Sequence, residues 1–141
     1  MPATVFQAIR REAEAAYPAE GCGFLLGRPR AEALVRVTRH QPVVNARVEA
    51  GTGRNRYEIA PGDFLRADMA ARAEGVEVLG TYHSHPDHPA KPSEYDREHA
   101  WPVYRYLIIA VDRGVAGAAR VWELSEDRSA FAEHILEIEE K

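Results

Sequence analysis

Cysteine is almost absent from this sequence, and long apolar runs are absent altogether. The single cysteine, Cys22, excludes an internal disulfide framework and any zinc site built from four cysteines. The longest apolar run, Leu107 to Val111, has the length of one strand, so we expect no membrane partner. Residues 1–12 bring in charges before any apolar run of seven, and we therefore expect a cytoplasmic protein with a reduced thiol.

An excess of positive charge is also missing. The chain has 18 basic and 22 acidic residues, a net charge of −4, which argues against a general nucleic-acid binder. The 45% of hydrophobic and 28% of charged residues are typical of a globular protein. A chain of 141 residues is long enough for one domain, which on folding buries roughly 68–70% of the surface that the unfolded chain exposes. We therefore expect a single domain over residues 1–141. The oligomeric state stays open.

Hydrophobic periodicity predicts an α+β fold with a mixed or largely antiparallel sheet. Helices are expected over residues 4–16, from Pro61 to a terminating glycine at Gly75, and from a Ser93 cap to about His99. The expected strands are 23–27, 33–38, 55–59, 76–82, 104–111 and 118–124. Residues 131–138 fit a strand and a helix about equally well.

Three of the six histidines lie within residues 83–88, and two of them, His83 and His85, end a predicted strand. Side chains two positions apart on a strand share a face, so both imidazoles can bind one ion. Asp96, one turn into the helix capped by Ser93, is the natural third ligand. Two histidines, one carboxylate and an open position for water are typical of a catalytic Zn²⁺ site, where bound water becomes acidic near neutral pH.

Each part of this pattern has an ordinary structural alternative. A His-x-His pair arises by chance in roughly a quarter of sequences with this many histidines, and Ser-x-x-acid also describes a helix capping box. The combination of His-x-His, seven residues and Ser-x-x-Asp arises by chance in roughly one sequence in a thousand. Capping and catalysis are also compatible, because a capped helix can still present Asp96.

The combined motif resembles that of the JAMM (MPN-plus) zinc metalloproteases. The stretch from Glu20 to Gly27 (Glu-Gly-Cys-Gly-Phe-Leu-Leu-Gly) resembles the short prokaryotic branch of that family, which acts on sulfur-carrier proteins. The resemblance runs from about Phe6 to Leu124. It implies a curved mixed β-sheet flanked by two main helices, similar in outline to cytidine deaminase.

The resemblance also implies a role for each motif residue. His83, His85 and Asp96 would hold zinc, Glu20 would act as general base and then acid, and Ser93 would donate a hydrogen bond to the oxyanion. Without the resemblance, nothing distinguishes Glu20 from the other glutamates.

Residues near the motif have less specific expectations. Cys22 is expected to be a small buried residue rather than a nucleophile, Tyr82 a core residue and His88 a solvated one. The role of His99 stays open, and Tyr95 and Trp101 are candidates to line a substrate channel.

The resemblance implies a substrate as well: the C-terminal tail of a ubiquitin-like or sulfur-carrier protein of the β-grasp type, cleaved at an amide bond. Such a tail can add beside an exposed strand edge, for which the segment 41–56 is a candidate. The alternative is a non-catalytic MPN module that binds a protein partner. A DNA-repair relative of the same fold is disfavoured by the acidic net charge.

Overall fold

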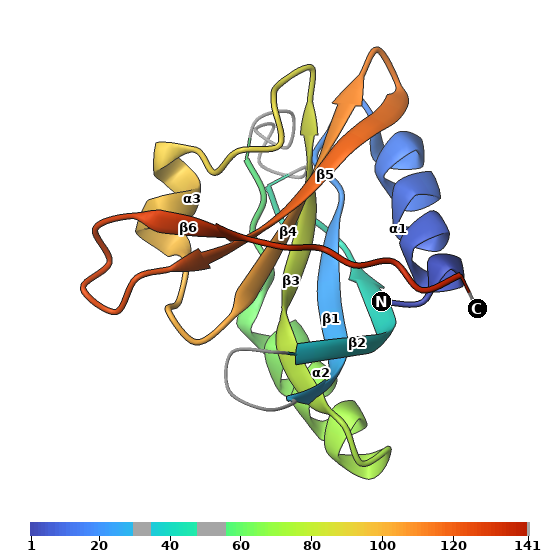
Figure 1. Ribbon diagram of the computed structural model, residues 1–141, viewed down its shortest axis with the longest axis vertical. Coiled ribbons are helices and arrows are strands. Elements are labelled where there is room, and N and C mark those ends of the chain that lie inside the picture. Colours follow the sequence, from blue (N-terminus) through green and yellow to red (C-terminus); the bar gives the residue numbers. More distant parts are fainter. Residues whose placement is uncertain (30–34, 48–55, 141) are drawn as a thin grey trace.

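The computed structural model describes residues 1–29, 35–47 and 56–140, and a six-stranded sheet forms its centre (Figure 1). The elements are α1 (Ala3–Ala16), β1 (Cys22–Pro29), β2 (Val35–Val43), α2 (Pro61–Ala73), β3 (Glu77–Pro86), α3 (Glu94–His99), β4 (Arg105–Asp112), β5 (Val115–Leu124) and β6 (Phe131–His134). The strand order is β2-β1-β3-β4-β5-β6. Only β3 and β4 of these neighbours run parallel, so the predicted mixed sheet and α+β class are confirmed.

Helices cover both faces of the sheet because side chains alternate along each strand. On β1, Leu25 faces the core cluster that includes residues of α1, whereas Phe24 and Leu26 face the cluster that includes residues of α2. Figure 1 shows α1 on one side of the strands and α3 on the other. Gly75 follows α2 with a φ of +73°, the left-handed conformation expected of a glycine that ends a helix.

Strand β3 is longer than the predicted strand 76–82. Its parallel pairing with β4 continues from Gly80, opposite Arg105, to Pro86, opposite Val111. The two motif histidines therefore lie within the sheet rather than beyond its edge. Strand geometry fixes their common orientation.

The predicted strand 55–59 is wrong for the part that the structure describes, residues 56–59. The Asn45 side chain accepts the backbone N–H of Glu58 at 3.0 Å and donates to the carbonyl of Arg56 at 2.9 Å. These backbone groups therefore bond to a buried amide instead of a sheet ladder, which propensity alone does not reveal.

The C-terminal residues resolve the ambiguity of 131–138 in favour of a short edge strand, β6, followed by irregular chain that meets Pro2 at Glu139. At the other edge lies β2, which includes the start of the segment expected to bind a substrate tail. Residues 48–55 of that segment lie outside the described residues. In the described part of the chain, no helix has the length and apolar character needed to cross a membrane.

Candidate active site

Two histidines of β3 form the centre of the site. His83 and His85 are 1% and 6% exposed, and their Nε2 atoms lie 3.2 Å apart. Tyr57 stacks on the His83 ring with centroids 4.2 Å apart, which fixes the plane of that imidazole. His85 is fixed differently, because its Nδ1 lies 2.8 Å from the carbonyl oxygen of Pro89.

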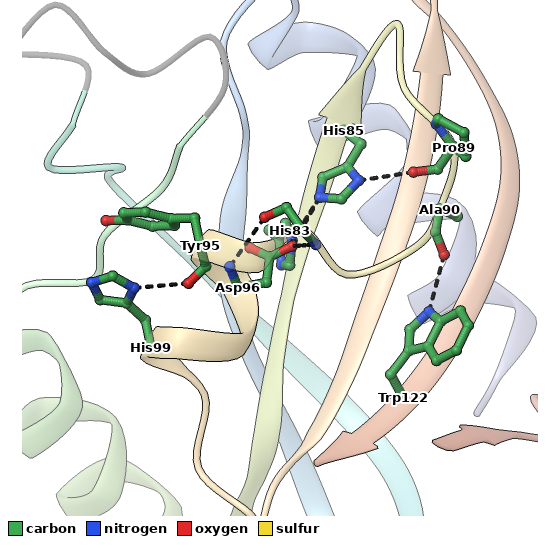
Figure 2. A network of polar contacts seen from close by, with 9 residues as sticks. His83, His85, Pro89, Ala90, Tyr95, Asp96, His99 and Trp122 are labelled. Atoms are coloured by element: carbon green, nitrogen blue, oxygen red, sulfur yellow. Dashed lines mark hydrogen bonds and ion pairs between the residues drawn. The ribbon is translucent and has the colours of Figure 1, made fainter. Parts of the chain in front are cut away.

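Helix α3 brings Asp96 to the histidines (Figure 2). Ser93 caps the helix: its Oγ accepts the N–H of Asp96 at 3.1 Å, and its own N–H donates to Asp96 Oδ2 at 2.9 Å. The same Oδ2 lies 3.3 Å from His83 Nε2 and 3.2 Å from His85 Nε2. The capping box and the predicted ligand position are therefore one arrangement, in which the cap orients the carboxylate.

The three atoms form a nearly equilateral triangle that fits a tetrahedral metal ion. Ligands about 2.0–2.1 Å from a zinc ion lie about 3.3–3.4 Å from one another, close to the observed edges of 3.2–3.3 Å. When both imidazoles are neutral with their lone pairs on Nε2, those two lone pairs and one of Asp96 Oδ2 point into the same space. A cation there would be coordinated by all three atoms, and the donor set of two nitrogens and one oxygen suits zinc.

Glu20 approaches the histidines from the residues just before β1. One carboxylate oxygen of Glu20 and one nitrogen of each histidine all lie within 4.8 Å of one another. Glu20 is 5% exposed, and its Oε1 has no hydrogen-bond partner among the described residues. Burial, followed by the charge of Asp96, raises the pKa of Glu20 from 4.5 to about 9.

The pKa of the second carboxylate, that of Asp96, is shifted in the opposite direction. Burial alone would raise the pKa of Asp96, but the two imidazoles and the Ser93 N–H hold it well below its usual range. Burial lowers the pKa of His83, which favours the neutral imidazole that binds metals. One carboxylate thus stays ionised, while the other readily holds a proton, a pairing typical of sites that transfer protons.

Two residues that the sequence analysis missed fix the backbone around Glu20. Asn45 is buried and donates to the Glu20 carbonyl at 2.9 Å. Ser84, between the two histidines, accepts the Gly21 N–H on its Oγ at 2.8 Å and donates its own N–H to the Gly21 carbonyl at 3.0 Å. The alternation of strand side chains already places Ser84 on the face opposite the histidines, whereas no local pattern points to Asn45.

Cys22 has the expected structural role. It is 4% exposed, and burial together with the charges of Glu20 and Asp63 raises the pKa of its thiol to about 12. A neutral, buried thiol is a poor nucleophile. We therefore expect Cys22→Ala to keep full hydrolytic activity, and the native thiol to react with a disulfide reagent only after unfolding. Rapid labelling of the folded protein, or loss of activity in the variant, would contradict this role.

The remaining candidates lie around the triangle formed by His83, His85 and Asp96. Tyr82 is 3% exposed in the core and donates to Glu12 at 2.6 Å, as expected of a core residue. His88 is exposed. His99 stacks on Tyr95 with centroids 4.0 Å apart, which places both rings on the flank of Asp96 away from His85 (Figure 2). Trp101 is 61% exposed.

Similarity to known proteins identifies the family of this chain. The family model of prokaryotic homologs of the JAB domain matches residues 2–125. The chain belongs to this family. The motif of Glu20, His83, His85, Ser93 and Asp96 falls inside the matched region, so the family resemblance inferred from the sequence is confirmed.

Three relatives are named as two desampylases and one probable conjugate cleaving protease. A desampylase from Haloferax volcanii is 41% identical over 67% of this chain and 65% of its own length. A desampylase from Pyrococcus furiosus is 36% identical over 76% of this chain and 68% of its own. A probable TtuB-protein conjugate cleaving protease from Thermus thermophilus is 35% identical over 67% of this chain and 58% of its own length. The chain thus spans about two thirds or less of these relatives.

Solved structures confirm the JAB-domain fold. A solution structure from Salinibacter ruber has 42% identity and a TM-score of 0.74, covering 96% of this chain and 88% of that one. A second, from Desulfitobacterium hafniense, has 27% identity and a TM-score of 0.84, covering 99% and 92%. A JAB1/MPN domain protein from Archaeoglobus fulgidus has a TM-score of 0.53, covering 95% of this chain and 93% of that one. At 18% identity, this likeness shows the fold alone.

Proposed function

We propose that this chain is a zinc-dependent metallopeptidase that hydrolyses the amide or isopeptide bond at the C-terminal tail of a ubiquitin-like or sulfur-carrier β-grasp protein. The observation that carries the proposal is the meeting of two histidines and an ionised Asp96 with the buried carboxyl of Glu20. The names of the relatives, desampylase and conjugate cleaving protease, support the substrate class. The proposal includes a single domain over residues 1–141 and a cytoplasmic location.

The site residues divide the chemistry between them. His83, His85 and Asp96 would hold the zinc ion, which when bound makes water acidic enough to attack near neutral pH. Glu20 takes the proton from the attacking water and returns it to the leaving nitrogen, so that water is added across the cleaved bond. Ser93 Oγ accepts only the Asp96 N–H among the described contacts, which leaves its hydroxyl hydrogen for the carbonyl oxygen of the substrate.

The proposal is tested by incubating the zinc-loaded protein with β-grasp proteins joined through their C-termini to a lysine side chain or a peptide, followed by mass spectrometry. We expect release of the intact carrier by wild type and not by Glu20→Gln. Binding of the carrier by both proteins with no cleavage by either would instead support the non-catalytic module. The complete set of five motif residues disfavours that alternative.

A further inference from the structure

A positively charged cluster lies beside the metal-binding triangle, on the residue that precedes Asp96. The guanidinium carbon of Arg56 lies 5.0 Å from the centre of the Tyr95 ring, and that of Arg47 lies 5.8 Å from it. Arg47 Nε also donates to Tyr95 Oη at 3.3 Å. With His99 stacked on the same ring, Tyr95 gathers two cations and an imidazole. We call Arg47, Arg56, Tyr95 and His99 the arginine cluster.

The backbone that carries the two arginines of the cluster is held in place by one buried side chain, Asn45. Asn45 uses both of its amide hydrogens and accepts two hydrogen bonds: it donates to the carbonyls of Glu20 and Arg56 and accepts from the N–H groups of Arg47 and Glu58. A buried amide with every bond made keeps its neighbours in one arrangement. The backbone of both arginines is thereby fixed relative to the backbone of Glu20.

The cluster also adjoins the site through its neighbours in sequence. Tyr57, next to Arg56, stacks on His83, and Tyr95 lies two residues after Ser93 and one before Asp96. A group bound by Arg56 would therefore lie close to a substrate carbonyl held at Ser93.

The carboxylates near the cluster are paired with arginines other than Arg56. Glu58 Oε1 lies 3.8 Å from Arg47 Nη2, and both carboxylate oxygens of Glu94 accept hydrogen bonds from Arg97 Nε. Arg56 is exposed and, within the described ranges, forms no ion pair. A guanidinium stacked on an aromatic ring keeps its in-plane N–H groups available, and their fork matches the two oxygens of a carboxylate.

We propose that the arginine cluster, through Arg56, binds an acidic side chain of the substrate within a few residues of the scissile bond. This inference rests on the proposed function, because it places the carboxylate on the protein being cleaved. It makes Arg56 a residue that determines specificity rather than one that takes part in bond cleavage.

The test uses short peptides in which a lysine side chain carries a tail ending in Gly-Gly. One series has Glu, Gln or Lys beside the modified lysine, and a second series has them before the Gly-Gly. Binding to zinc-loaded Glu20→Gln is measured by fluorescence anisotropy, which separates recognition from turnover. We expect the Glu peptide of one series to bind about 10-fold tighter than the Lys peptide, as one charged hydrogen-bonded pair implies. That series identifies the side of the bond that carries the carboxylate.

Three variants in the Glu20→Gln background complete the experiment. Arg56→Gln should remove the preference for Glu, and Arg56→Glu should reverse it. Arg11→Gln makes the same charge change on an exposed residue of α1, on the far side of the sheet, and should leave the preference unchanged. Equal binding of all peptides, or a Glu preference that survives Arg56→Glu, would overturn the inference. If the Glu preference is found but the wild type cleaves none of the peptides or protein conjugates, the proposed function fails instead.

Discussion

Replacing His85 with alanine is expected to remove both the metal and the activity. Only two of the three atoms of the triangle would remain, and Asp96 would lose a partner at 3.2 Å. A catalytic metal supplies several kcal/mol of transition-state stabilisation, so the hydrolysis rate should fall about 10³–10⁴-fold or more. Zinc content, measured by atomic emission, should drop from about one per chain in wild type to near zero.

Thermal stability provides a readout that does not depend on turnover. A ligand that binds only the folded protein stabilises it by about 4 kcal/mol when its free concentration exceeds Kd a thousandfold. Zinc should therefore raise the Tm of the wild type and leave that of His85→Ala unchanged. His88→Ala is the matched control, because this exposed histidine lies three residues further along and should keep the zinc-dependent shift. A His85→Ala protein that still binds one zinc ion would refute the ligand assignment.

The arrangement of His83, His85 and Asp96 was predictable because each of its constraints is local in sequence. The alternation of a strand places His83 and His85 on one face, and the cap at Ser93 fixes where Asp96 falls on α3. The chain between them is short, and Trp122 Nε1 holds it to the sheet by donating to the Ala90 carbonyl at 3.0 Å. Strand alternation, the helix cap and this short connection were therefore sufficient to predict that the three side chains meet.

The residues that were missed act through contacts distant in sequence. Asn45 bonds Glu20 across 25 residues, so no local pattern identifies it. The same amide explains the wrong strand at 56–59, where it replaces a ladder partner. Glu20 was identified only through the family resemblance, since its proposed role depends on its burial beside the histidines of β3 and not on its neighbours in sequence. Strand β3 was predicted too short because its parallel pairing with β4 is also non-local.

Replacing Glu20 with glutamine should separate catalysis from metal binding. The triangle of His83, His85 and Asp96 remains, so we expect zinc content close to that of the wild type. Loss of a general base and acid costs about 10²–10⁴-fold in rate, and we expect kcat to fall by that factor with little change in KM. Equal loss of zinc in Glu20→Gln would instead show that Glu20 is a ligand.

The same variant should change how the stability of the metal-free protein depends on pH. The folded-state pKa of Glu20 is raised from 4.5 to about 9, so the folded protein binds this proton more tightly than the unfolded chain. The resulting stabilisation is fully present below about pH 4.5 and is lost as the pH rises toward about 9, with a slope of up to about 1.4 kcal/mol per pH unit. Glutamine does not titrate, and the Glu20→Gln protein should lack this part of the slope.

Urea unfolding in the presence of a chelator, from pH 5 to pH 9, measures the difference between the two proteins. Titrating groups that do not interact with Glu20 cancel in that difference, so a gap that widens in favour of Glu20→Gln with rising pH reports Glu20 and the groups coupled to it. Zinc should narrow the gap, because a nearby cation favours the ionised carboxylate and lowers its pKa. A gap that does not change with pH would mean that Glu20 is ionised in the folded metal-free protein. That result would contradict the raised pKa of Glu20 and leave its role as general base to the kinetic test of Glu20→Gln.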